Sequence, residues 1–370
     1  MPGTALFGEL AREKLKAIEA QGRLRSLRTL ASASLGGNAA CAMDLTHNDY
    51  LNFRDDFAFQ ERARAAARDW PIGAGASRLL GGEHRIYAEL ESAFSQWNGS
   101  EASLYFTSGY AANETLITVL AQFDADFFSD ALNHASLIDG MRLARSSSRD
   151  SKHIFRHNDL DHLAHQLKTS KKRAKVVVTE SLFSMDGDKA PLRELSALCQ
   201  EFEALLVVDE AHALGVYGQT GSGLTEEFGL DPKSLITINP CGKAMAASGA
   251  LISGPAWLRT LLINMGRGFI YSTGASPWVA SGLRANLDTI AKAGDRRSHL
   301  TALSHELREG LTLLGLDYGT SKSHIIPLIL GSEARSLKAE HALAERGILA
   351  RAIRPPTVPE GSCRLRLSLH

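Results

Sequence analysis

Two short stretches of this sequence carry side chains that could do chemistry together. Lys243 stands among small residues in "NPCGKAMAASGALISG", and Asp209 ends the apolar run "LLVVD" three residues before His212. A desolvated lysine amine can join an aldehyde covalently, and a buried aspartate is costly unless a cation faces it. The two stretches therefore suit an aldehyde cofactor whose ring nitrogen Asp209 keeps protonated and whose phenolic oxygen His212 can reach.

Two further motifs supply what pyridoxal phosphate requires of a protein. "NHASLIDG" offers His134 as a flat group against the ring. "FTSGYAAN" places Ser108, Gly109 and Tyr110 where a helix would begin, so that free backbone N–H groups could hold the phosphate. An amine, a carboxylate, a flat group and phosphate donors are together the parts of such a site.

Each of these side chains also has an ordinary structural explanation. Lys243 could be a surface lysine in a turn, because most lysines are exposed. Asp209 could be a helix N-cap, and His134 could be a histidine bonded to its neighbours. Cys241, two residues before Lys243, is best explained as a small packing residue.

Residues 209–212, "DEAH", also match a metal-binding box of nucleic-acid helicases. A nucleotide-binding P-loop needs GxxxxGK[ST], but Gly242-Lys243 is followed by alanine and has no glycine five residues earlier. The 41 Lys and Arg residues balance 41 Asp and Glu residues, so no net positive field attracts a phosphate polymer. The sequence therefore excludes an ATPase and a nucleic-acid partner.

No metal site or secreted framework is expected. In "RHNDLDHLAH" only His162 and His165 share a helical face, and His157 does not lie on it. No acid–histidine zinc motif accompanies these histidines. The four cysteines lie far apart, which is typical of a reducing compartment. The N-terminal stretch lacks the apolar core of a signal peptide and no run reaches the roughly 18 apolar residues of a membrane span. We expect a cytoplasmic protein with no membrane partner.

The elements that must position these residues are short apolar strands. They are "KVVVTE" (175–180), "ALLVVDE" (204–210), "SLITIN" (234–239) and "GALISG" (249–254). Such runs, separated by helical patterns, predict parallel strands with helices on both faces, that is, an α/β sheet. Ligands bind beyond the carboxyl ends of such strands. Glu180, Asp209, Asn239 and then Lys243 stand at those ends.

The chain is predicted to have three parts. Residues 1–45 form an N-terminal helix and arm, and residues 46–285 form a large cofactor-binding domain. Residues 286–370 contain amphipathic helices and the short strands "IIPLIL" and "CRLRLSL", which predict a smaller α+β domain.

Ten motifs resemble, in order and spacing, those of the α-oxoamine synthases, which are fold-type I pyridoxal-phosphate enzymes. The likeness runs from about residue 5 to the end and rests on "NDYLNF", "GAGASRLLGGEH", "FTSGYAAN", "LNHASLIDG", "FRHNDLDHL", "TESLFSMDGD", "VVDEAHALGVYGQTGSG", "GKAMAASGA", "GFIYST" and "AIRPPTVPEGSCRLRLSLH". The resemblance implies a large, mostly parallel sheet domain, a smaller α+β domain and a homodimer with shared active sites.

The resemblance also implies a role for each site residue. Lys243 would bind the cofactor aldehyde, Asp209 the ring nitrogen and His212 the phenolic oxygen, with His134 stacked on the ring. The phosphate pocket would comprise Ser108, Gly109, Tyr110, Ser184 and, from the neighbouring subunit, Thr273. The carboxylate of the amino acid would be bound by Asn48 and by Arg366, whose guanidinium can do so bidentately. An exposed strand-edge arginine is the alternative for Arg366.

The string "AIRPPTVP" (352–359) is most similar to the biotin-pathway members of the family, which join L-alanine to a pimeloyl thioester. We expect Arg354 to lie at the acyl-donor side and to favour a donor with a distal carboxylate or its ester. The alternative is that Arg354 bonds carbonyls around a proline-rich turn. Glycine C-acetyltransferase remains a second candidate activity, and a non-catalytic fold-type I partner subunit a third.

Three features depart from the family pattern. Pro240 stands where members commonly carry a threonine whose hydroxyl helps to bind the phosphate, so weaker cofactor retention is expected. Ala246 replaces a usual glycine. The sequence ends at His370, where relatives usually continue for about another helix, so some flank of the smaller domain is expected to be less well covered.

Overall fold

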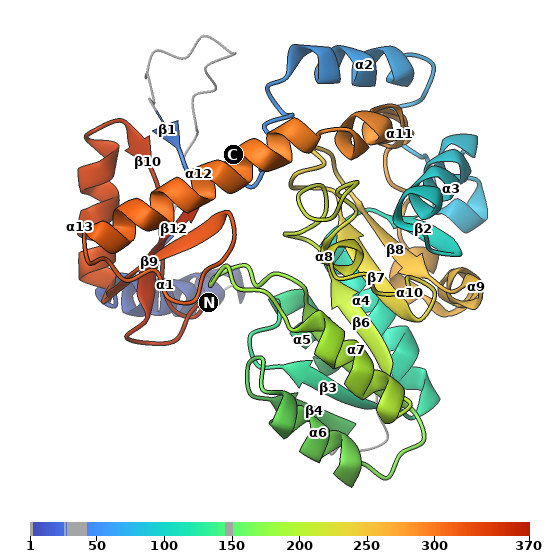
Figure 1. Ribbon diagram of the computed structural model, residues 1–370, viewed down its shortest axis with the longest axis horizontal. Helices are drawn as coiled ribbons and strands as arrows, with labels where there is room; N and C mark the ends of the chain where they lie inside the picture. Colours follow the sequence, from blue (N-terminus) through green and yellow to red (C-terminus); the bar gives the residue numbers. More distant parts are fainter. Residues whose placement is uncertain (1–2, 26, 28–42, 145–150) are drawn as a thin grey trace. The chain divides into compact units, whose positions relative to one another are not determined.

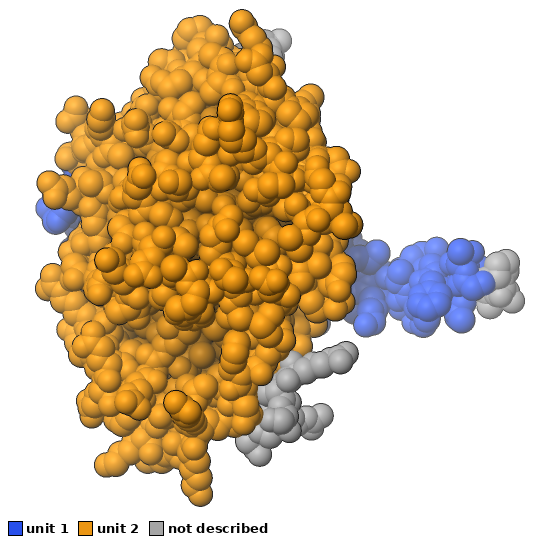
Figure 2. Space-filling view, turned by 90° about the vertical axis from the view of Figure 1, so that its right-hand side faces the viewer, with its two compact units in different colours: residues 1–47, 185–187, 302–369 blue, residues 48–184, 188–301, 370 orange. Residues whose placement is uncertain are grey.

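The computed structural model describes residues 3–25, 27, 43–144 and 151–370. By internal contacts the chain divides into two compact units, coloured separately in Figure 2. Unit 1 comprises residues 1–47, 185–187 and 302–369, and unit 2 comprises residues 48–184, 188–301 and 370. Helix α12 (Gly294–Leu313) runs across the boundary between them. The three-part division at residues 45 and 285 stays a prediction.

Unit 2 is built on a seven-stranded sheet with the order β2-β8-β7-β6-β5-β3-β4 (Figure 1). Its strands are β2 (Ala102–Phe106), β3 (Asp126–Asp130), β4 (Lys152–Phe155), β5 (Lys175–Glu180), β6 (Leu205–Asp209), β7 (Leu235–Pro240) and β8 (Ala250–Gly254). The four strands predicted from apolar runs are β5 to β8, and the α/β class is confirmed.

The expectation that all four strands are parallel was wrong for β8. Strands β7, β6, β5, β3 and β4 pair in parallel, but β8 pairs antiparallel with both β7 and β2. Only residues 241–249 connect β7 to β8, and a parallel crossover needs a dozen or more residues. The turn that carries Lys243 is therefore a reversal between neighbouring strands.

Helices cover the sheet of unit 2 and bury both of its faces. They are α2 (Phe57–Ala67), α3 (Arg85–Asn98), α4 (Gly109–Leu120), α5 (Ala135–Leu143), α6 (Leu160–Thr169), α7 (Leu192–Glu201), α8 (Leu224–Glu227), α9 (Ala256–Met265), α10 (Arg267–Ile270) and α11 (Pro277–Ala291), with the short 3₁₀ helices Arg78–Leu80 and Ala121–Phe123. Val177, Val207 and Ile238 are fully buried, which explains why these strands read as continuous apolar runs. Helix α7 buries Leu192, Leu195 and Cys199, one face at helical spacing.

Unit 1 contains a three-stranded antiparallel sheet with the order β11-β12-β9. Its strands are β9 (Ile325–Gly331), β11 (Arg351–Ile353) and β12 (Cys363–Ser368), and β9 and β12 confirm the two strands predicted there. Unit 1 also contains helices α1 (Gly3–Ala20) and α13 (Glu333–Ala344), residues 302–313 of α12, and the parallel pair β1 (Met43–Asp44) and β10 (Ile348–Leu349). No described helix is both long and apolar enough to cross a membrane.

Candidate active site

A cavity of about 500 Å³ lies at the carboxyl ends of β5, β6 and β7, within unit 2. Ligands of α/β sheets bind at this edge, so the cavity lies where the sequence analysis predicts the cofactor. The residues that line it are Asn48, Thr107, Ser108, Gly109, Tyr110, Asn113, His134, Ser136, Glu180, Asp209, Ala211, His212, Pro240, Gly242, Lys243, Ala247, Ser248 and Gly249. Eight predicted site residues are therefore brought together.

Asp209 ends β6 with its carboxylate held by two N–H groups. One oxygen accepts from the backbone N–H of Ala211 at 2.9 Å, and the other accepts from Asn113 Nδ2 at 2.8 Å. Asp209 is 3% exposed, and a turn rather than a helix follows it, so the helix N-cap alternative is wrong. A buried carboxylate fixed in this way faces the cavity ready for a cation.

His134 is the N-cap of α5, and its ring is oriented by Ser136. The His134 Nδ1 atom lies 2.7 Å from Ser136 Oγ and accepts from the Ser136 backbone N–H at 3.3 Å. Asn113 Nδ2 donates to Ser136 Oγ at 2.8 Å, so the serine proton points to Nδ1 and the ring proton resides on Nε2. Burial lowers the His134 pKa, and Lys243 lowers it further, whereas Asp209 raises it. The result is a neutral, flat ring at the cavity.

His212 belongs to a chain of hydrogen bonds that begins at Asn48. Its Nδ1 atom lies 2.6 Å from the Tyr50 hydroxyl, and Tyr50 Oη donates to Asn48 Oδ1 at 3.1 Å. These contacts hold the imidazole of His212 in place through Nδ1. Nε2 is the ring nitrogen that could meet a ligand hydroxyl.

The first turn of α4 forms another wall of the cavity. Ser108 is the N-cap, and its Oγ accepts from the Ala111 N–H at 3.2 Å. The next N–H groups, from Gly109 and Tyr110, start the helix, and a helix N-terminus attracts anions. A Cβ atom on Gly109 would lie 2.8 Å from Cγ of Pro240. Only glycine fits there, because the proline ring packs directly against this turn.

Four predicted site residues are not among those that line the cavity. Ser184 follows β5, and its backbone N–H forms a hydrogen bond with the Glu180 carboxyl group that lowers the pKa of Glu180. Thr273 is exposed between α10 and α11. Arg366, in unit 1, is buried on β12 and donates to Ser368 Oγ at 2.7 Å, so the alternative of an exposed strand-edge arginine is wrong. Arg354, also in unit 1, donates to the Gly22 carbonyl. Their roles stay predictions.

Asn239, at the end of β7, does not face the cavity. Its Nδ2 atom donates to Thr237 Oγ1 at 2.9 Å and to the Leu251 carbonyl at 3.2 Å, both within the sheet. The position of a polar residue at a strand end therefore did not reveal which face its side chain takes.

The sequence missed three residues that hold the site in shape, namely Tyr50, Asn113 and Ser136. A signal existed for each of them. Asn113 stands one helical turn after Gly109 in "FTSGYAAN", and Ser136 and Tyr50 each stand two residues after a predicted site residue. Of these spacings, that of Gly109 and Asn113 places both residues on one face of α4.

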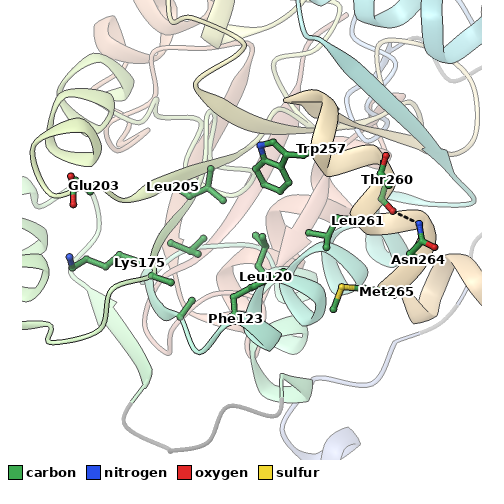
Figure 3. A pocket seen from close by; sticks show the side chains of 13 residues that line it. Leu120, Phe123, Lys175, Glu203, Leu205, Trp257, Thr260, Leu261, Asn264 and Met265 are labelled. Carbon is green, nitrogen blue, oxygen red and sulfur yellow. Dashed lines mark hydrogen bonds between the residues drawn. The ribbon is translucent and has the colours of Figure 1, made fainter.

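A second, larger cavity of unit 2 is lined mostly by apolar side chains. It measures about 920 Å³ and adjoins the amino-terminal ends of β5 and β6, opposite the edge that carries Asp209. Leu120, Leu205 and Trp257 surround it (Figure 3), and the polar groups labelled there include the Asn264 amide, which donates to the Thr260 carbonyl at 2.8 Å. Its lining offers no cluster of acids, bases and amines.

The histidine group of "RHNDLDHLAH" has a structural role. His157 lies 2.9 Å from Asp130 Oδ1 through Nδ1 and 2.7 Å from Asp188 Oδ2 through Nε2. Burial lowers its pKa, but the two aspartates outweigh burial and raise it to about 10. Within the described part of the chain no group of histidine, cysteine, aspartate or glutamate could hold a metal ion.

The residues of the smaller cavity fit pyridoxal phosphate. Lys243 lies close enough to His134 and Glu180 to change the pKa of both, so its amine sits beside the flat ring and the acids. Small residues 242 and 247–249 leave room for a planar ring. The N-terminus of α4 supplies the phosphate donors. One cavity thus contains an amine, a carboxylate, two imidazoles and a turn that can bind an anion.

The comparisons with known proteins agree with this geometry. The profile of the family "Aminotransferase class I and II" matches residues 41–370. The chain is 42% identical over 361 residues to the 8-amino-7-oxononanoate synthase of Anaeromyxobacter dehalogenans, covering 96% of this chain and 89% of the relative.

Two solved structures share the fold. The serine palmitoyltransferase of Sphingomonas wittichii matches with a TM-score of 0.88 and 28% identity, covering 100% of this chain and 93% of that one. The 8-amino-7-oxononanoate synthase of Francisella tularensis matches with a TM-score of 0.75 and 25% identity, covering 89% and 92%. The chain therefore belongs to the class I and II aminotransferase family and, within it, to the α-oxoamine synthases.

Proposed function

We propose that the protein is a pyridoxal-phosphate enzyme that condenses L-alanine with a pimeloyl thioester, carried by coenzyme A or an acyl carrier protein. The products are 8-amino-7-oxononanoate, carbon dioxide and the free thiol carrier, and the reaction is a step of biotin biosynthesis. One observation carries the proposal: Lys243, Asp209, His134 and His212 line one cavity in a chain that is 42% identical to an 8-amino-7-oxononanoate synthase.

When bound, pyridoxal phosphate supplies an electron sink for the α-carbon of alanine. The carboxylate of Asp209, fixed by Asn113, would stabilise a positive charge on the ring nitrogen. His134 presents its neutral ring face, and His212 offers Nε2 to the phenolic oxygen. Gly109 and Tyr110 hold the phosphate through backbone N–H groups, with Ser108 fixing that turn, and Ser184 and the partner subunit's Thr273 add to this pocket.

The proton movements belong to Lys243. Its Nζ takes the α-proton of alanine, the α-carbon attacks the thioester carbonyl, and the thiol carrier leaves. Loss of carbon dioxide from the resulting β-keto acid leaves a carbanion that Nζ reprotonates. Asn48 and Arg366 bind the alanine carboxylate, the arginine bidentately, and Arg354 recognises the distal end of the acyl donor.

The proposed enzyme is a homodimer, since Thr273 of one subunit serves the site of the other. The exposed position of Thr273 is consistent with this. We also propose that the enzyme is cytoplasmic. A non-catalytic partner subunit is disfavoured, because Lys243, Asp209, His134 and His212 are all present.

The test compares two substrate pairs. Purified protein is assayed with L-alanine and a pimeloyl thioester, on coenzyme A or an acyl carrier protein, and in parallel with glycine and acetyl coenzyme A. We expect carbon dioxide and 8-amino-7-oxononanoate from the first pair only, and none from the K243A variant. Turnover of the second pair alone would make the protein a glycine C-acetyltransferase, and turnover of neither would favour the partner subunit.

A further inference from the structure

Glu180 is a buried carboxyl group in the cavity that the proposed reaction does not use. It ends β5 directly beside Asp209, its register partner on β6, and it is 2% exposed. Both oxygens of Asp209 accept hydrogen bonds, but Glu180 Oε1 is buried and has no hydrogen-bond partner among the described residues. An unsatisfied buried oxygen costs free energy unless a ligand completes it.

The charges around Glu180 decide which form of the carboxyl group is stable. The groups that act on it are Asp209 on β6, Lys243 after β7, and the backbone N–H groups of His134 and Ser184. Burial first, and then the charge of Asp209, raise the Glu180 pKa well above its usual value of 4.5. Lys243 and the two N–H groups oppose this shift without reversing it. Two carboxylates side by side cannot both stay ionised cheaply.

We propose that Glu180 is a neutral hydrogen-bond donor in this cavity, with its proton on Oε1, and that Asp209 is the one anion among the residues that line it. Among the described residues no N–H group donates to Oε1, so the proton can reside on this oxygen. The group it meets is an acceptor atom of the bound cofactor or of the amino acid joined to it. Only the identity of that ligand rests on the proposed function.

A neutral donor suits the ligand better than a second carboxylate would. Pyridoxal phosphate and an amino acid both bring negative charge, which a second anion at this depth would repel. One anion at Asp209 is enough to keep the ring nitrogen protonated. Glu180 would therefore add a directional contact without adding charge.

Cofactor-free protein tests the protonation state independently of activity. A group whose folded pKa is raised keeps its proton in the folded state, so folding stability falls as pH rises above the usual value of 4.5 toward the folded pKa. Glutamine has the same shape and cannot lose a proton. The urea midpoint of E180Q should therefore rise relative to that of wild type as the pH increases above the usual value of 4.5. A difference that stays flat or reverses would overturn the neutral acid.

Glu210 provides a matched control. It is equally buried, but both of its oxygens are bonded: Oε1 accepts from the Thr225 N–H at 2.7 Å, and Oε2 accepts from the Leu224 N–H at 3.1 Å and from Ser181 Oγ at 2.6 Å. An amide in either orientation would point N–H at N–H. E210Q should therefore lower the urea midpoint at every pH, which shows that glutamine is not simply tolerated at buried glutamates.

The cofactor-loaded enzyme tests the donor role. E180Q keeps an N–H donor at this site and E180A does not, so E180A should bind pyridoxal phosphate at least about tenfold more weakly than E180Q. Equal affinities of the two variants would overturn the donor. If the pH-dependent stability behaves as expected and no alanine-dependent turnover is found, the proposed function fails while the neutral Glu180 stands.

Discussion

At the scale of single residues, the site combines side chains that motifs reveal with side chains that only folding brings in. Lys243, Asp209, His134 and His212 stood out because their types suit one cofactor and their strands end at one sheet edge. Asn113 could not be predicted in the same way, because its function is to bond two other site residues, Asp209 and Ser136, through one amide nitrogen. The motif marks the position of Asn113, one helical turn after Gly109, but not the two partners that packing brings to it.

Pro240 gives a prediction at this scale. It lines the cavity and lies against Gly109, yet it has neither a hydroxyl nor a backbone N–H to offer a phosphate. Replacement of Pro240 by threonine restores both donors, so the dissociation constant for pyridoxal phosphate should fall about tenfold. Fluorescence titration of the cofactor-free protein measures it. P240V, which matches threonine in shape without the hydroxyl, should gain less; equal affinity of wild type and P240T would contradict the expectation.

Arg354 gives a second prediction at the scale of single residues. If it recognises the acyl donor, R354A should raise KM for the pimeloyl thioester about tenfold and leave KM for L-alanine nearly unchanged. Steady-state kinetics with each substrate varied in turn measures both constants. Since Arg354 also donates to the Gly22 carbonyl, thermal unfolding of R354A serves as a control for structural damage. An unchanged thioester KM would remove Arg354 from substrate recognition.

At the scale of elements, apolar runs predicted where strands lie but not their direction. The runs that became β7 and β8 look alike in the sequence, and the nine-residue connection, residues 241–249, decides that they are antiparallel. Strand β3, "DFFSD", was not predicted because polar residues interrupt its apolar pattern. The bounds of β5 to β8 were predictable because these strands are buried on both faces and are mostly apolar.

The turn between β7 and β8 carries a strained residue. Ala246 has φ +49°, in the left-handed region that glycine adopts without strain. A246G should therefore raise the free energy of unfolding by about 0.5–1 kcal/mol, after allowance for the greater entropy of glycine in the unfolded chain. Urea unfolding at neutral pH measures it. The neighbouring A247G, at a position without positive φ, should lower the stability; a loss in A246G equal to that in A247G would refute the strain.

One contact between elements should depend on pH. It joins β3 to the loop after β4 and to the loop before α7. His157 bridges Asp130 and Asp188 with a pKa raised to about 10. A raised folded pKa means that this stability is fully present below the unfolded pKa of about 6.5 and is lost as pH rises through 10. The loss should be about 2–4 kcal/mol and should be absent in H157Q. Urea unfolding from pH 6 to 10 checks this; parallel slopes in the two proteins would contradict it.

At the scale of the whole molecule, the balanced charge argued against a nucleic-acid partner, and the dispersed cysteines argued against a disulfide framework or a zinc ribbon. The α/β sheet and the smaller α+β lobe followed from hydrophobic patterns, and the family from ten motifs in order. Arg366 was named from its motif, and its role in binding the amino-acid carboxylate stays a prediction.

The proposed reaction requires that Lys243 joins pyridoxal phosphate covalently in the cavity beside Asp209. Borohydride reduction of the yellow holoenzyme, followed by proteolysis and mass spectrometry, tests this bond. We expect a single pyridoxyl-modified peptide that contains Lys243, and no modified peptide from K243A. A modification at another lysine, or an unchanged cofactor spectrum and turnover in K243A, would contradict it.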